Sequence, residues 1–248
     1  MQKNILYVII LWAVSYGLAG CTEIEPEKFS AANGVNFMSK ITDGWSDDVD
    51  GLKIAYNFGV NFKEWNAPQD TVVIQVKLEG LNNEQPLKIR LKGEKVEKFS
   101  MADLVFADDY AFTPGKNTTQ LSVILKRPAQ TDVVYQTNVM VDYATSDVVA
   151  GTKERQKFLL EVKDELTLKM VQITESDWVT SIEKKLGAYS KTRLRFIAYA
   201  LKLTDFRSMG WYGPSAKQIT QVQEKFKEYN DAHIGNPILD DDGTPLVF

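Results

Sequence analysis

Apolar and polar residues alternate in short runs between about residues 35 and 168. Alternation with a period of two predicts half-buried β-strands, because successive side chains of a strand point to opposite faces. The predicted strands are residues 52–60, 72–78, 87–93, 121–126, 138–143 and 155–166. Segments that contain turn-forming residues separate them, at 66–68, 80–86 and 114–117. Short strands that recur with turn signals predict two packed sheets.

After about residue 170 the apolar residues recur every three or four positions, which predicts helices. Three helices are predicted, and their capping residues are Ser176 or Asp177, Ser190 and Ser215. The first helix is expected to run to Leu186 and to stop at Gly187. Ser215 and Gln218 have the spacing of a capping box. A turn at Asp242-Gly243 leads into a short apolar tail.

These patterns together predict an α+β chain. Its N-terminal part, residues 35–168, is expected to be an immunoglobulin-like β-sandwich. Its C-terminal part, residues 169–248, is expected to be a mainly helical region. A length of 248 residues is ample for a buried core and favours two domains.

The N-terminus has the layout of a secretory signal. Lys3 precedes an apolar run from Ile5 to Ala19, and small residues follow. This run is shorter than the roughly 20 apolar residues of a membrane-spanning helix. We therefore predict that residues 1–20 are a cleaved signal peptide.

Cys21 is the only cysteine in the chain and directly follows this run. Residues 18–21, Leu-Ala-Gly-Cys, resemble the bacterial lipobox. In that motif the cysteine thiol is lipidated, and the cysteine becomes the new N-terminal residue when the signal is cleaved. Several acyl chains, palmitate among them, provide a stable membrane anchor. The alternative is an ordinary secreted protein with a chance cysteine. The acidic tether, residues 21–34, resembles the signal for export to the cell surface; its alternative is a plain solvated linker.

Composition excludes several classes of function. The formal net charge is −4, and no concentrated basic patch is present, so no nucleic acid is expected as a partner. His233 is the one histidine, and its loop-like context predicts no catalytic base. Zinc sites need several His or Cys ligands, which this chain lacks. We expect no enzyme, no cofactor and no bound metal.

Two acidic runs approach the pattern of a calcium loop. Residues 46–51 place oxygen ligands at alternate positions, but Asn57 stands where a bidentate Glu is expected. Residues 240–243 have Ile238 in place of the first ligand. Simple turns are the alternative for both runs and are favoured.

Aromatic residues supply the remaining candidates. Trp65, Trp211 and Tyr212 lie in segments that read as loops beside polar residues. A loop tryptophan can stack on a sugar or on a peptide side chain, with its indole N–H free to donate a hydrogen bond. The alternative is that these residues pack at the end of the sandwich or at the domain junction.

Several segments resemble a family of Bacteroidota lipoproteins encoded beside SusC- and SusD-like outer-membrane nutrient importers. These segments are YNFGV (56–60), DTVVIQVKLEGL (70–81), FADDYAFTPGKNTTQLSVILKRP (106–128), LGAYSKTRLRFIAYAL (186–201) and EYNDAHIGNPILDDDGTPLVF (228–248). Residues 82–91 match the family pattern more loosely. The resemblance implies a surface lipoprotein of the outer membrane that takes part in nutrient capture or complex assembly. Asp70-Thr71-Val72 also fits the acceptor pattern for O-linked glycosylation of exported Bacteroidota proteins.

The resulting functional hypothesis is an accessory lipoprotein of a Sus-type import system that holds a glycan or peptide near the transporter. The main alternative is a purely structural subunit that binds the SusC/SusD-like proteins without contacting a nutrient.

Overall fold

The computed structural model describes residues 33–41, 44–48, 50–80 and 83–248. The predicted signal peptide, Cys21 and nearly all of the acidic tether lie outside these ranges. Residues Asn33–Phe248 form a single unit. Among the described residues, no helix has both the length and the apolar character that crossing a membrane requires.

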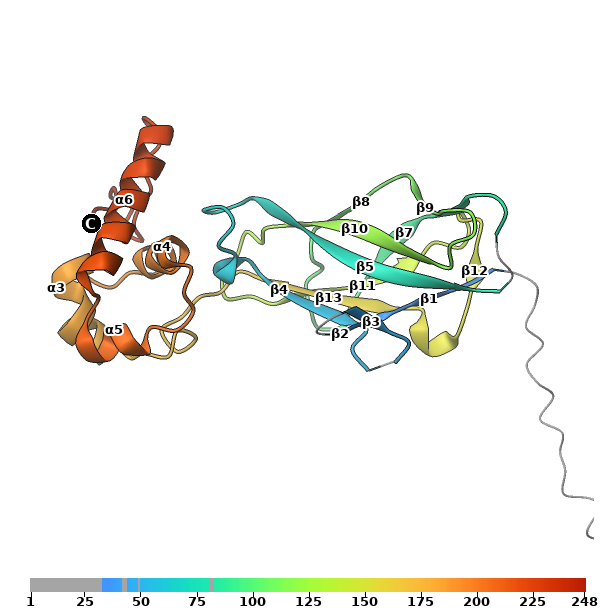
Figure 1. The fold of residues 1–248 in the computed structure, drawn as a ribbon, viewed down its shortest axis with the longest axis horizontal. Coiled ribbons are helices and arrows are strands. Elements are labelled where there is room, and N and C mark those ends of the chain that lie inside the picture. Colours follow the sequence, from blue (N-terminus) through green and yellow to red (C-terminus); the bar gives the residue numbers. More distant parts are fainter. Residues whose placement is uncertain (1–32, 42–43, 49, 81–82) are drawn as a thin grey trace, which may run out of the picture. The chain divides into compact units, whose positions relative to one another are not determined.

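Two sheets form the β-sandwich of the described part of the chain (Figure 1). The first sheet has the spatial order β12 (Val149–Ala150), β1 (Gly34–Phe37), β5 (Gln69–Glu79), β10 (Thr118–Lys126) and β8 (Leu104–Phe106). The second has the order β4 (Lys53–Asn57), β13 (Phe158–Lys163), β11 (Tyr135–Val141) and β7 (Leu91–Lys95). Two short pairs accompany them, β2 (Ser39–Ile41) with β3 (Gly44–Ser46) and β6 (Leu87–Ile89) with β9 (Tyr110–Phe112). Neighbours are antiparallel except for the parallel pairs β1/β12 and β4/β13.

The alternation seen in the sequence places one face of each long strand in the sandwich core. In β5 the buried side chains are Val72, Ile74, Val76 and Leu78. The neighbouring β10 buries every second residue in the same way, and Ile74 pairs with Leu121 in the register. The prediction of a β-sandwich is confirmed, because burial follows the period of two.

Two predicted strands differ from the observed ones. The run 87–93 is split at Arg90, and its two halves pair with different partners, β6 with β9 and β7 with β11. Apolar alternation continues across the break, so the pattern cannot show where the partner changes. The run 52–60 leaves the sheet after Asn57, because the Asn57 side chain accepts a hydrogen bond from the Gly59 N–H (2.9 Å) and caps a 3-10 turn, Phe58–Val60.

Helices follow the strands in sequence, shown in orange and red in Figure 1. They are α2 (Glu175–Asp177), a π-helical turn (Trp178–Ile182), α3 (Glu183–Leu186), α4 (Lys191–Leu201), α5 (Arg207–Tyr212) and α6 (Ala216–Ala232). These elements have their own hydrophobic core, in which Trp178, Phe196 and Phe206 are fully buried.

The predicted starts of α4 and α6 are confirmed. Ser190 accepts a hydrogen bond from the Arg193 N–H, and Ser215 forms the expected capping box with Gln218. The predicted cap of the first helix is wrong. Thr174 is the N-cap, and Asp177 is its capping-box partner inside the helix.

Candidate functional site

The predicted pair Trp211–Tyr212 is exposed to solvent. Contrary to the expectation of a loop, both residues form the last turn of α5. Trp211 is 70% and Tyr212 is 83% exposed, and their rings meet edge to face with centroids 6.4 Å apart. The preceding residues Met209 and Gly210 are buried, so the helix faces the core with one side and presents this aromatic pair on the other.

Close packing fixes the position of α5. A Cβ added to Gly210 would lie 3.0 Å from a methyl group of Ile173 and 3.3 Å from the Asp177 Cβ. The helix ends at Gly213, whose φ of +73° favours glycine. The aromatic pair is therefore held on a firmly packed element, as a preformed contact surface requires.

Trp65 occupies a different environment. It is half-buried, and its ring contacts Phe196 and Tyr199 of α4, with centroid distances of 5.2 and 5.7 Å. This contact is the packing role that the sequence left open as an alternative. Among the described residues, no aromatic ring pair joins Trp65 to Trp211. The structure thus separates the aromatic candidates, and ligand binding by Trp65 stays a prediction.

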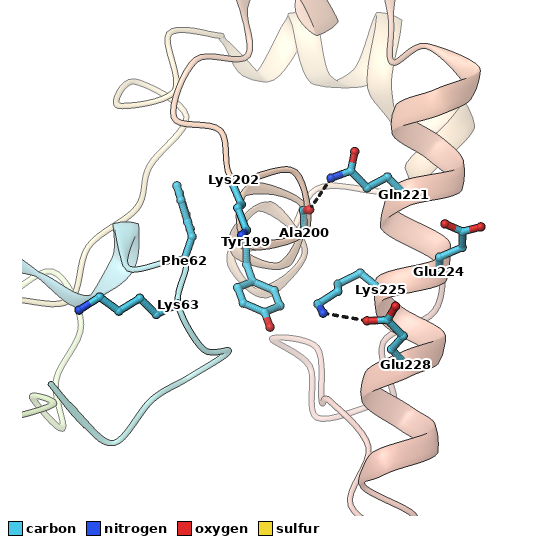
Figure 2. A pocket seen from close by; sticks show the side chains of 9 residues that line it. All are labelled: Phe62, Lys63, Tyr199, Ala200, Lys202, Gln221, Glu224, Lys225 and Glu228. Carbon is cyan, nitrogen blue, oxygen red and sulfur yellow. Dashed lines mark hydrogen bonds and ion pairs between the residues drawn. The ribbon is translucent and has the colours of Figure 1, made fainter.

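A groove that the sequence did not indicate lies where the loop after β4 meets α4 and α6. It consists of two adjoining hollows of about 300 and 520 Å³ that share Phe62, Lys63 and Lys202. We call it the junction groove. Figure 2 shows the smaller hollow, with Tyr199 between Phe62 on one side and Gln221 on the other.

A hydrogen-bond network lines the larger hollow. Tyr56 donates its hydroxyl to Asp70, and the Asn61 side-chain amide donates to both residues, at 2.8 and 2.9 Å. Lys63 Nζ lies 3.1 Å from Asp70 Oδ2. Burial raises the pKa of Tyr56, and the neighbouring Asp70 carboxylate raises it further. Burial alone would raise the pKa of Asp70, but the hydrogen bonds from Tyr56, the Thr71 N–H and Lys63 outweigh it and lower that pKa.

The smaller hollow is lined by the C-terminal end of α4 and by α6. Gln221 Nε2 donates to the Ala200 carbonyl oxygen at 2.9 Å, and Lys225 Nζ lies 2.7 Å from Glu228 Oε2. Lys202 is the C-cap of α4, in the left-handed region with a φ of +53°. The two helical walls of this hollow are therefore bonded to each other through Gln221, and Phe62 and Lys63 complete the lining.

A buried ionic cluster joins the sandwich to α4 beside the groove. Asp164, just after β13, accepts hydrogen bonds from Arg127 Nε (2.8 Å) and Arg127 Nη2 (3.3 Å), and also from Arg195 of α4. Only 4% of the Asp164 side chain is exposed. Burial lowers the pKa of Arg195, which the Asp164 carboxylate partly offsets. The single carboxylate therefore bridges two guanidinium groups from different parts of the fold.

The second acidic run has a structural role in the described chain. Asp241 accepts hydrogen bonds from the N–H groups of Lys191 (2.7 Å) and Thr192 (3.0 Å), so it caps α4 together with Ser190. These bonds help to lower the Asp241 pKa against the raising effect of burial, which is the largest contribution. Asp240 pairs with Arg193 at 3.2 Å.

The first acidic run is likewise engaged by protein groups. Asp47 lies 2.5 Å from Lys77 and 3.3 Å from Arg155. Across the described ranges, no group of three or more His, Cys, Asp or Glu side chains is placed to hold a metal ion. His233 is the exposed C-cap of α6, and its ring stacks on Tyr229 at 4.0 Å. Thr71, in the predicted glycosylation pattern, is exposed near the start of β5.

Sequence reasoning missed the groove because its residues are far apart in the chain. The one available signal was the resemblance itself, since YNFGV and the segment 186–201 supply Tyr56 and Tyr199. Neither segment carries a local pattern that predicts their meeting.

Comparison with known proteins gives only distant matches. No family model and no curated protein matches the chain, so the family resemblance drawn from its sequence stays a prediction. A proposed carbohydrate-binding protein from Bacteroides ovatus is 11% identical, with 54% of this chain and 37% of that one covered and a TM-score of 0.37. EndoBT-3987 from Bacteroides thetaiotaomicron, solved with a Man5GlcNAc product, is 13% identical, with 50% and 30% covered and a TM-score of 0.33. The PapD-like domain 7 of human CEP192 is 10% identical, with 60% and 98% covered and a TM-score of 0.34.

The matched region thus spans about a third of the two Bacteroides proteins. At these identities and TM-scores the likenesses carry no argument about activity or ligand. What the chain shows by itself is a β-sandwich followed by a helical region.

Proposed function

We propose that this protein is a surface-exposed accessory lipoprotein of a Sus-type outer-membrane import system, and that it holds a glycan or peptide near the transporter. The observation that carries the proposal is the exposed pair Trp211–Tyr212 on the closely packed helix α5. Large aromatic faces lose much of their contact with water when a sugar ring or an apolar side chain covers them. Such a pair is suited to weak, reversible binding of a polymer at the surface.

The remaining parts of the proposal come from the sequence. Lipidation at Cys21 anchors the chain to the outer membrane, the acidic tether directs it to the cell surface, and the SusC/SusD-like importer is its protein partner. We assign the protein a binding role rather than catalysis, and an immunoglobulin-like topology to its sandwich.

A second candidate function uses the same observation. Aromatic residues are enriched at the centres of protein–protein interfaces, so the pair could dock directly on the SusC/SusD-like proteins. The protein would then be an assembly subunit that contacts no nutrient. The two functions differ in what the pair touches, and a binding assay separates them.

Replacing both Trp211 and Tyr212 by alanine should weaken retention on a polysaccharide or peptide ligand by at least about tenfold, because the stacking surface is removed. Affinity electrophoresis in gels with starch, xylan or mannan, and a parallel assay with a casein hydrolysate, measures this. Since both side chains are exposed, the free energy of unfolding should change by less than about 1 kcal/mol.

Ile234→Ala is the matched control, because Ile234 is 91% exposed and apolar but lies outside α5. It should leave retention unchanged. Trp65→Ala is a poor probe, since its ring packs on Phe196 and Tyr199. Unchanged retention in the double variant, together with lost co-purification of the importer, would favour the assembly subunit.

Cys21→Ser should prevent lipidation and move the protein from the membrane fraction to a soluble fraction, because a chain without acyl groups lacks an anchor. Labelled palmitate and cell fractionation measure this directly. Added protease should digest the wild-type protein on intact cells. A variant that stays in the membrane fraction, with no palmitate on the wild type, contradicts the lipoprotein assignment.

A further inference from the structure

The junction groove has the size of a small-ligand site. Its hollows of about 300 and 520 Å³ lie within the range of roughly 300–1,000 Å³ in which ligand pockets fall. The two hollows meet at Phe62, Lys63 and Lys202, so a chain of a few sugar units could lie across both.

Most of the charges that line the groove are paired with one another. Lys63 is paired with Asp70 at 3.1 Å, and Lys225 is paired with Glu228 at 2.7 Å. Two charged side chains of opposite sign remain, Lys202 and Glu224, and Glu224 points away from the hollow (Figure 2). An anionic ligand would gain only the single Lys202 ammonium, and a cationic ligand would meet carboxylates that lysines already pair. A neutral ligand can use the same ammonium as a hydrogen-bond donor.

The groove also combines an aromatic surface with hydrogen-bonding groups. The half-buried Tyr199 ring contacts Trp65 and Phe196, with centroid distances of 5.7 and 6.0 Å, and Phe62 lies on its other side from Gln221 (Figure 2). Gln221 uses its amide N–H on the Ala200 carbonyl, which leaves its Oε1 to accept from a ligand hydroxyl. Lys202 supplies ammonium donors at the point where the hollows meet.

Apolar ring faces beside hydroxyl partners are the chemistry that a neutral sugar requires, because each pyranose has an apolar C–H face and a rim of hydroxyl groups. We infer that the junction groove is a binding site for a neutral oligosaccharide of two to three units, separate from the aromatic pair Trp211–Tyr212. The inference rests on the proposed nutrient-binding role and adds to it a second site and a ligand class. The pair captures the polymer, and the groove holds a short segment or a released fragment.

Two substitutions test the groove without disturbing the core. Lys202→Gly removes the ammonium group at a position whose φ of +53° suits glycine. Gln221→Trp fills the smaller hollow from an exposed position of α6. Lys227→Ala is the matched control, because Lys227 is an exposed lysine of α6 outside the groove.

The experiment is calorimetric titration of the purified protein with maltotriose, xylotriose and mannotriose, beside trigalacturonic acid and trialanine. At least one neutral trisaccharide should bind. Its affinity should fall about tenfold in Lys202→Gly and be lost in Gln221→Trp. Lys227→Ala should bind it as the wild type does. The indole N–H signal of Trp65 should shift on binding, because Trp65 contacts Tyr199.

Other outcomes overturn the inference in distinguishable ways. Absence of trisaccharide binding, with polysaccharide retention still dependent on Trp211, removes the groove site and leaves the proposed function standing. Binding of trialanine or trigalacturonic acid that Gln221→Trp abolishes overturns the ligand class. If Trp211→Ala abolishes trisaccharide binding and Lys202→Gly leaves it unchanged, the proposed location of the site is overturned. If the wild type binds no polysaccharide, no peptide and no trisaccharide, the proposed function is overturned as well.

Discussion

Replacing Asp164 by alanine should lower the free energy of unfolding by about 3–5 kcal/mol, the range found when one partner of a buried ion pair is removed. Arg127 and Arg195 would then lie close together with no carboxylate between them, each with only 15–16% of its side chain exposed. For a chain of this size the melting midpoint should fall by about 10 °C. Differential scanning calorimetry of the wild type and variant measures the shift.

The matched control is Glu94→Ala. Glu94 is also an ion-paired carboxylate, with Lys157 as its partner, but about half of each side chain is exposed. Exposed pairs contribute at most about 1 kcal/mol, so this variant should melt close to the wild type. Equal midpoints for Asp164→Ala and Glu94→Ala would show that the cluster does not stabilise the attachment of α4 to the sandwich.

Gly59→Ala should destabilise the protein by about 3 kcal/mol, at the upper end of the range for overpacking. A Cβ at this position would lie 2.2 Å from the carbonyl oxygen of Glu165, and that oxygen belongs to the backbone. To remove this overlap, the 3-10 turn would have to move away from Glu165. Asn57 would then lose its two hydrogen bonds to the Glu165 backbone, at 2.9 and 3.0 Å. Chemical denaturation with urea measures the loss.

Gly44→Ala adds the same methyl group at a position where, apart from its chain neighbours, no heavy atom of the described residues lies within 4 Å. It should change the free energy of unfolding by less than about 1 kcal/mol. If Gly59→Ala is equally mild, the close contact between the 3-10 turn and Glu165, just after β13, is not a constraint on the fold. Residue propensities cannot tell these two glycines apart, because they differ only in a neighbour that is remote in the sequence, Glu165 beside Gly59.

The two large effects lie at one place, the junction between the sandwich and α4. Arg127 adds a cation–π contact with Phe58 there, at 5.5 Å from the ring centroid. The junction groove opens beside these contacts, so its walls are held by them. Variants that loosen the junction should therefore be checked for folding before any change in ligand binding is assigned to the groove.

The sequence by itself determined the features that depend on neighbours along the chain. The period of two in 72–78 and 121–126 predicted β5 and β10, because burial of one face requires alternation. Ser190 and Ser215 predicted the starts of α4 and α6, because a cap bonds an N–H two or three residues away. Net charge and the counts of histidine and cysteine limited the chemistry to be expected.

Tertiary structure alone decided the strand partners, the environments of the tryptophans and the groove, because these features depend on which surfaces meet. Apolar alternation runs through Arg90 unbroken, yet β6 and β7 find partners in different sheets. Trp65 and Trp211 read alike in the sequence, but one packs on α4 and the other stands in solvent. The junction groove brings Tyr56, Asp70 and Tyr199 together from distant segments. No local pattern encodes such a meeting, since its free energy comes from contacts between side chains that are remote along the chain.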